Sequence, residues 1–153
     1  MSKKVVLAFS GGLDTSFCVP YLKEQGYEVH TVMVNTGGFS AEEEKAIEER
    51  AMKLGAASHK NVNAVNTYYE KGIRYLIYGN ILKNATYPLS VSSERVFQAL
   101  EVLKQVKAIG ADAVAHGSTG AGNDQVRFDI VFEILAPSVE IIAPVREHGF
   151  TRQ

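Results

Sequence analysis

The strongest constraint on the fold is the regular alternation of β-rich and helical segments along the chain. Three glycines, Gly26, Gly55 and Gly110, each end a helical stretch and precede a β-rich one, and glycine commonly terminates helices in the left-handed conformation. Strands joined by helices favour a parallel sheet. We therefore predict an α/β fold, a doubly wound, five-stranded and mainly parallel sheet with helices on both faces. The predicted strands are residues 4–9, 27–34, 56–63, 112–116 and 139–143.

Four further segments have helical character. Residues 40–54 open with Ser40 and Glu43 at capping-box spacing, which marks a helix N-terminus. Residues 67–80 are also expected to be helical. In the first helix, which begins near Leu13, Pro20 lacks a backbone N–H and predicts a kink or a late start. The apolar stripes expected to face the sheet are Ile47, Ala51 and Leu54 in residues 40–54, Val96, Leu100, Leu103 and Val106 in residues 93–109, and Val126, Ile130 and Ile134 in residues 124–135.

A glycine turn between the first strand and the helix after it predicts a phosphate site. Residues 5–16 read VVLAFSGGLDTS. Gly11 and Gly12 carry no Cβ, so the backbone there can turn sharply and approach a ligand closely. The helix that begins near Leu13 directs unpaired N–H groups and its positive dipole end at that turn. Nucleotide chemistry is therefore the leading hypothesis.

Two later segments resemble this turn in their position after a strand. Residues 35–38 follow the second strand, and residues 116–124 follow the fourth. Ligands of open parallel sheets collect at the carboxyl ends of the strands, so we expect all three segments on one rim. The chain has no Gly-x-x-x-x-Gly-Lys-Ser/Thr sequence, and residues 117–122 have the wrong glycine spacing for a dinucleotide fingerprint.

Composition narrows the class of protein. The 153 residues suffice for one domain with a buried core, and the net charge of −1 gives no general attraction to nucleic acid or to anionic membranes. The single cysteine, Cys18, excludes an internal disulfide and a Cys-x-x-Cys metal site, and we expect it to be a buried apolar residue. The four histidines show no metal-ligand spacing. Residues 1–4 lead directly into a strand without a signal peptide or membrane span, so we expect a cytoplasmic protein.

Several motifs carry a resemblance to a known family. Residues 10–16, SGGLDTS, resemble the pyrophosphate-binding loop of the N-type ATP pyrophosphatases, which GMP synthetase, asparagine synthetase, NAD synthetase and tRNA-thiolating enzymes share. Residues 87–92, YPLSVS, and residues 116–128, HGSTGAGNDQVRF, resemble argininosuccinate synthase. Residues 142–147 resemble the end of the nucleotide-binding domain of that family. The resemblance covers the whole chain.

The resemblance implies the reaction and its substrates. The family uses ATP to activate citrulline as an adenylate, releases pyrophosphate, and joins the product to aspartate with loss of AMP in arginine biosynthesis. ATP is a substrate, and Mg²⁺ is expected with it. The ATP-binding residues implied are Ala8, Phe9, Ser10, Gly11, Gly12, Leu13, Asp14, Thr15, Ser16, Val34 and Gly117.

The resemblance also divides the amino-acid contacts. The citrulline-binding residues implied are Tyr87, Ser92, Asn123 and Arg127, and the aspartate-binding residues are Thr119, Asn123 and Asp124. Asp14 and Asp124 are the catalytic candidates, and Asp14 is also suited to help position Mg²⁺, since hard cations prefer oxygen ligands. A simple helix N-cap is the alternative for Asn123 and Asp124.

The chain departs from the family in three places and in length. Ala121 stands where the family has Lys, Glu94-Arg95-Val96 stands for Ala-Arg-Pro, and Val145 stands for Trp. Family members continue into a synthetase domain that adds citrulline contacts and most of a homotetramer interface. We expect residues 1–153 to form the ATP-binding domain, to bind ATP and to turn over poorly alone, in an undetermined oligomeric state. The alternatives are a tRNA-thiolating enzyme with the same loop and a non-enzymatic nucleotide-binding module.

Overall fold

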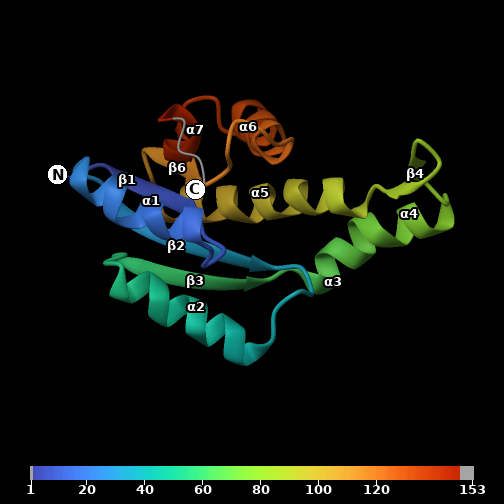
Figure 1. Cartoon of the computed structure of the whole chain (residues 1–153), viewed down its shortest axis with the longest axis horizontal. Coiled ribbons are helices and arrows are strands. Elements are labelled where there is room, and N and C mark those ends of the chain that lie inside the picture. Colours follow the sequence, from blue (N-terminus) through green and yellow to red (C-terminus); the bar gives the residue numbers. More distant parts are fainter. Residues whose placement is uncertain (1, 149–153) are drawn as a thin grey trace.

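A five-stranded sheet forms the centre of the computed structural model, which describes residues 2–148 apart from the side chain of Lys83 (Figure 1). The strand order is β3-β2-β1-β6-β7, and each neighbouring pair is parallel. The predicted α/β class is confirmed, and the sheet is parallel throughout. Its strands are β1 (Lys4–Ala8), β2 (Glu28–Asn35), β3 (Ser58–Asn63), β6 (Ala113–His116) and β7 (Glu140–Ile142).

Helices cover both faces of the sheet because its strands are apolar on both sides. Val5 and Leu7 of β1 point to one face and Val6 points to the other, and all three are fully buried. The first face packs against α1 (Leu13–Glu24), α2 (Ala41–Lys53) and the short α7 (Pro144–Glu147). The second face packs against α5 (Ser90–Ile109) and α6 (Asp124–Leu135).

The helix ends follow the local sequence signals. Gly26, Gly55 and Gly110 all have positive φ angles and follow helices, as predicted. At the start of α2 the Glu43 amide donates to Ser40 Oγ, and the Ser40 amide donates to Glu43 Oε2, which confirms the capping box. Of the two effects expected of Pro20, a kink or a late start, the late start does not occur: α1 begins at Leu13 and runs through Pro20, held to the sheet by its buried apolar face.

The expected buried stripe of α6 is wrong. Val126, Ile130 and Ile134 have exposed fractions of 48%, 49% and 69%, while Phe128 and Phe132 are buried against the sheet. The two rows of apolar residues on α6 compete for one buried face, and the aromatic pair removes more apolar area from water.

The stripes of the other two helices are confirmed to different extents. In α2, Ile47 and Ala51 are buried and Leu54 packs against them. In α5, Leu103 and Val106 are buried as expected, but the sheet-facing row is completed by Ala99 and Val102, while Val96 and Leu100 are only partly buried.

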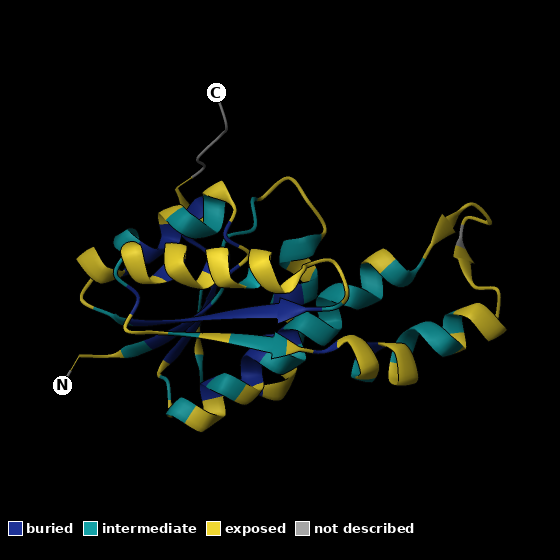
Figure 2. Cartoon of the chain, turned by 90° about the horizontal axis from the view of Figure 1, so that it is seen from below, coloured by how far each residue is buried: buried dark blue, intermediate teal, exposed yellow. Residues whose placement is uncertain are grey.

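An arm projects from the sheet between β3 and α5 (Figures 1 and 2). The helix expected over residues 67–80 forms as α3 (Val65–Tyr68), the π-helical turn η1 (Tyr69–Ile73) and α4 (Arg74–Tyr78). A hairpin of β4 (Leu82–Lys83) and β5 (Tyr87–Pro88), which was not predicted, follows it. Among the described residues, none of the helices combines the length and apolar character needed to span a bilayer.

Candidate functional site

A pocket of about 890 Å³ lies at the carboxyl ends of the strands. Residues 10 and 12–15 enter it after β1, residues 38 and 39 enter after β2, and residues 116–119 enter after β6. The three glycine segments therefore meet at one rim, as the parallel topology requires. Glu94, Arg95 and Gln98 of α5 form the remaining polar wall.

The turn after β1 leaves donors available at the pocket. Gly11 has a φ of +72°, and Gly12 is the N-cap of α1 without a side-chain cap hydrogen bond. The hydroxyls of Ser10 and Thr15 lie 3.3 Å apart, and the Gly12 amide is 3.4 Å from Ser10 Oγ. Ser16 Oγ is buried and makes no hydrogen bond within the described chain. Hydrogen-bond donors at a helix N-terminus that have only long contacts or no partner can bind an anion.

Arg50 of α2 supports this turn from behind. Its Nη1 donates to the carbonyl of Gly11, 39 positions earlier in the chain. The carbonyl oxygen of Gly11 is thereby paired with a side chain that lies outside the pocket lining. Sequence reasoning missed Arg50, since it lies in an amphipathic helix and belongs to no motif.

The loop after β6 touches the first loop directly. A Cβ placed on Gly117 would lie 3.0 Å from Thr15 Cγ2 and 3.1 Å from the Thr15 amide nitrogen. Only a glycine allows the two backbones to come this close. The buried ring of His116 precedes this loop, and burial lowers its pKa.

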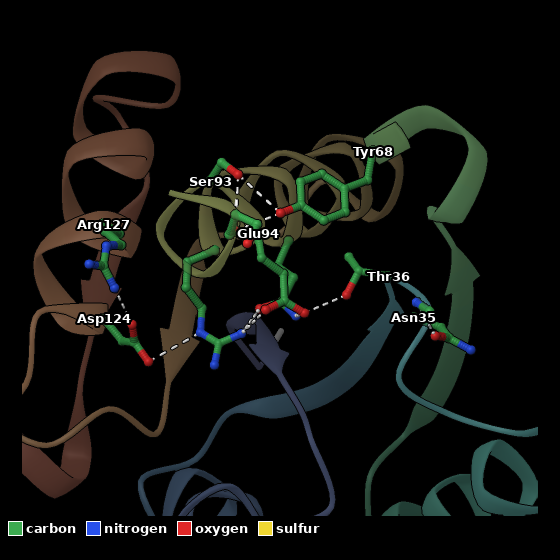
Figure 3. A network of polar contacts seen from close by, with 11 residues as sticks. Asn35, Thr36, Tyr68, Ser93, Glu94, Asp124 and Arg127 are labelled. Carbon is green, nitrogen blue, oxygen red and sulfur yellow. Dashed lines mark hydrogen bonds and ion pairs between the residues drawn. The ribbon is translucent and has the colours of Figure 1, made fainter. Parts of the chain in front are cut away.

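A network of polar contacts crosses the pocket from the β2 loop to α6 (Figure 3). Thr36 Oγ1 donates to Glu94 Oε1 at 2.5 Å, and the other Glu94 oxygen lies 3.1 Å from Arg95 Nη1. Arg95 Nε donates to Asp124 Oδ2 at 3.1 Å, and Asp124 Oδ1 accepts from Arg127 at 2.6 Å. The two arginines flank the Asp124 carboxylate, and Arg95 also pairs with Glu94, so the network balances two positive charges with two negative ones.

Most of the residues implied by the resemblance lie at the pocket. Those that line it are Ala8, Phe9, Ser10, Gly12, Leu13, Asp14, Thr15, Val34, Gly117, Thr119 and Asp124. Gly11 and Ser16 lie outside the lining, within the same turn and the first turn of α1. Ala121 also lines the pocket, at the place of the family lysine.

The residues that the resemblance implies for citrulline are more dispersed. Arg127 Nη2 donates to Ser92 Oγ at 3.0 Å, so these two meet behind Asp124 without lining the pocket. Asn123 is the N-cap residue of α6, but its side chain makes no cap hydrogen bond, so capping does not explain it. Tyr87 lies on the hairpin of the arm, 49% exposed and outside the pocket lining.

Two pocket residues of α5 were missed as site residues. Glu94 and Gln98 line the pocket one helical turn apart, beside Arg95. Glu94 was noted only as a departure from the family pattern, and its contact with Thr36 joins residues 58 positions apart. Only the side-by-side packing of α5 and β2 brings that pair together.

Comparison with known proteins decides the family. Residues 4–153 match the family model described as "Arginosuccinate synthase N-terminal HUP domain". The chain belongs to the argininosuccinate synthase family. The argininosuccinate synthase of Xylella fastidiosa is 49% identical over 146 residues, which cover 95% of this chain and 36% of that protein. That of Hyperthermus butylicus is 49% identical over 150 residues, 97% of this chain and 37% of that protein. The chain thus spans little more than a third of the length of these argininosuccinate synthases.

Solved structures share the fold at low sequence identity. A 4-thiouridine synthetase in complex with RNA and ATP has a TM-score of 0.68 and 19% identity, covering 95% of this chain and 37% of that one. A predicted subunit of a tRNA methyltransferase from Methanocaldococcus jannaschii has a TM-score of 0.62 and 22% identity, covering 97% and 70%. These likenesses concern the fold alone, whereas the match to the argininosuccinate synthase family extends over residues 4–153.

Proposed function

We propose that this chain is the ATP-binding part of an argininosuccinate synthase. The enzyme would condense citrulline with aspartate through a citrullyl-adenylate and release pyrophosphate and AMP. The observation that carries the proposal is the meeting of residues 10–15 and 116–124 at one pocket, in a chain of this family. The alternatives, a tRNA-thiolating enzyme or a non-enzymatic nucleotide module, have no comparable support.

The phosphate half of the site is the turn after β1. The amides at the start of α1 and the hydroxyls of Ser10, Thr15 and Ser16 would hold the triphosphate and then the leaving pyrophosphate. Charge grows on that group as the bond to the α-phosphorus breaks, and one donor aimed at developing charge contributes on the order of 3 kcal/mol. The adenine would lie toward Val34, beside the apolar wall of the pocket.

Mg²⁺ would accompany the nucleotide. Within residues 2–148 no group of three or more acidic, histidine or cysteine side chains forms a metal site. Asp14 lines the pocket in the first turn of α1, so it would share the ion with phosphate oxygens, the usual manner for this cation. The ion would offset phosphate charge, and Asp14 would orient it.

The amino-acid half lies between α5 and the loop before α6. Asp124 would pair with the substrate ammonium, and Thr119 would bond the aspartate carboxylate. Arg127, Ser92, Asn123 and Tyr87 would contact citrulline. The distance of Tyr87 from the pocket lining implies that the arm moves or that the rest of a full-length enzyme completes this part.

The remaining proposals concern the whole enzyme. Residues 1–153 would bind ATP but turn over poorly, because the family resemblance implies that a synthetase domain adds further citrulline contacts and most of a homotetramer interface. The enzyme would be cytoplasmic and would need neither nucleic acid nor a membrane.

Ligand-dependent thermal stability tests the proposal. ATP with Mg²⁺ is expected to raise the Tm, and citrulline and aspartate are expected to raise it further when ATP is present, because ligands stabilise the state that binds them. GTP serves as the matched control. Stabilisation by ATP alone would support the nucleotide module instead, and citrulline-dependent AMP formation at the rate of a full-length relative would contradict the expected poor turnover.

A further inference from the structure

We propose that His116 is a positioning residue that holds the glycine-rich loop of residues 117–122 in its ligand-binding shape. The inference rests on the proposed function, because this loop carries Gly117 and Thr119 to the pocket. It concerns a buried side chain whose ring nitrogens both have partners, and one of those partners is the backbone of the loop itself.

The hydrogen bonds of the His116 ring assign its tautomer. The side chain is 1% exposed at the end of β6. The backbone N–H of Ser118 donates to Nδ1 at 3.2 Å, so Nδ1 carries no hydrogen. In the neutral ring Nε2 is then the donor, and it faces Asp129 Oδ1 at 2.9 Å. The ring also stacks on Phe128 with the centroids 5.6 Å apart, which fixes its plane.

The same network returns to the loop at a second point. The other oxygen of Asp129 accepts from Arg146 of α7, and Arg146 also donates to Gln125 Oε1 at 3.2 Å. Gln125 Nε2 donates to the carbonyl of Gly120 at 2.7 Å. A closed circuit of side chains from β6, α6 and α7 therefore ties the loop at Ser118 and at Gly120.

This circuit determines where the proposed ligand contacts lie. Gly117 precedes the anchored Ser118 and packs against Thr15, while Thr119 follows it into the pocket. Loss of the Ser118 bond would leave a part-buried N–H without its protein partner and let Thr119 move. The expected effect is on affinity for the amino acid at Thr119, with less effect on ATP at the turn after β1.

The hydrogen bond from the Ser118 amide to His116 Nδ1, called the anchor below, is expected to depend on pH. A proton on Nδ1 would turn the acceptor of the Ser118 bond into a donor and break it. Burial lowers the pKa of His116 below its ordinary 6.5. The charged groups facing the ring are Asp129, which raises the pKa, Arg146, which lowers it, and Glu147, which raises it. The bond is therefore intact above about pH 6.5 and lost in acid.

Nitrogen NMR of the unliganded wild-type chain tests the anchor without any ligand. At pH 7.5 the ring is expected as the Nε2–H tautomer, with the Ser118 amide protected from hydrogen exchange. A protonated Nδ1, or a Ser118 amide that exchanges as fast as an exposed one, would overturn the inference.

Two variants with amide side chains separate the acceptor role of His116 Nδ1 from the other contacts of the ring. His116→Asn keeps an acceptor near the place of Nδ1, whereas His116→Gln keeps a donor near the place of Nε2, and both remove the stacking on Phe128. We expect similar Tm losses for both variants. Only His116→Gln should lose Ser118 protection and bind aspartate, with a non-hydrolysable ATP analogue present, about tenfold more weakly, as expected when a part-buried hydrogen bond is lost.

The pH dependence of aspartate binding and the binding of ATP and aspartate to the wild type complete the test. The aspartate affinity of the wild type is expected to fall in acid, once the pH is below the lowered pKa of His116, and that of His116→Asn is not. Equal weakening by both variants, or equal pH profiles, would overturn the positioning role. A wild type with a protected Ser118 amide that binds neither ATP nor aspartate would instead contradict the proposed function and leave the anchor standing.

Discussion

The guanidinium Nε of Arg95 lies 3.1 Å from Oδ2 of Asp124 and joins α5 to the first turn of α6 beside the pocket (Figure 3). The other carboxylate oxygen is held by Arg127 at 2.6 Å. Asp124 is thus oriented from two sides before any substrate arrives. A substrate ammonium would meet a carboxylate whose position is set, and a substrate carboxylate would meet the two arginines.

Asp124→Asn should weaken aspartate binding by about tenfold or more, because the substrate ammonium loses its charged partner. ATP affinity should change by less than about twofold, since the turn after β1 is untouched. Isothermal titration with each ligand checks this division. Glu133→Gln on the exposed side of α6 is the control. Loss of ATP binding in Asp124→Asn would show that the two halves of the site are divided wrongly.

Gly11→Ala should lower the free energy of unfolding by at least about 2 kcal/mol, because Gly11 has a φ of +72° and a new Cβ would lie 2.9 Å from Ile47 Cγ1. Gly12→Ala is the matched variant. Its φ is −75°, and the nearest atom to a new Cβ is Ser10 Oγ at 3.4 Å, so it should cost less than about 1 kcal/mol. Urea unfolding measures the free energy of unfolding of both variants. Equal losses of stability would count against the backbone conformation described for Gly11.

Gly117→Ala should weaken ATP binding about tenfold or more, since the new methyl group must displace Thr15 and the backbone of Asp14. Gly120→Ala is the control in the same loop, because its Cβ would make only an ordinary contact of 3.7 Å with Arg146 Cγ. Titration of ATP into each variant measures the difference. Unchanged ATP affinity in Gly117→Ala would mean that the two loops do not depend on their close contact.

Arg50→Met should reduce ATP affinity about fivefold, because the Gly11 carbonyl loses its donor at a cost of about 1 kcal/mol. Methionine keeps most of the apolar stem, so the change isolates the guanidinium. Lys53→Met removes an exposed positive charge from the same helix and should leave ATP affinity unchanged. If Lys53→Met has the same effect, the net charge of α2 and not the Gly11 contact is responsible.

Cys18 should resist alkylation in the folded chain. Burial, with a smaller effect of Asp14, raises the pKa of its thiol from 9.0 to about 12, so no thiolate forms near pH 8. Because the folded pKa lies above the unfolded one, the stabilising effect is complete below about pH 9 and is lost as the pH rises toward 12. Mass spectrometry after iodoacetamide treatment at pH 8, with and without urea, checks this. Modification without urea would contradict the burial of Cys18.

Local signals in the sequence determined most of the secondary structure. The positive φ of Gly26, Gly55 and Gly110 and the capping box of Ser40 act within a few residues, so the helix ends were predictable. The alternation of strands and helices likewise determined the parallel sheet, and with it the rim where residues 10–12 and 116–124 meet.

The tertiary structure alone decided which apolar row of α6 is buried and which distant side chains support the loops. Helical spacing shows that Val126, Ile130 and Ile134 share a face. Only one apolar row of α6 can pack against the sheet, however, and that row contains Phe128 and Phe132. The contacts of Arg50 with Gly11, and of His116 with Asp129, join residues on separate elements. Such contacts depend on how the elements pack, and packing energy depends on shapes and areas that no short stretch of sequence contains.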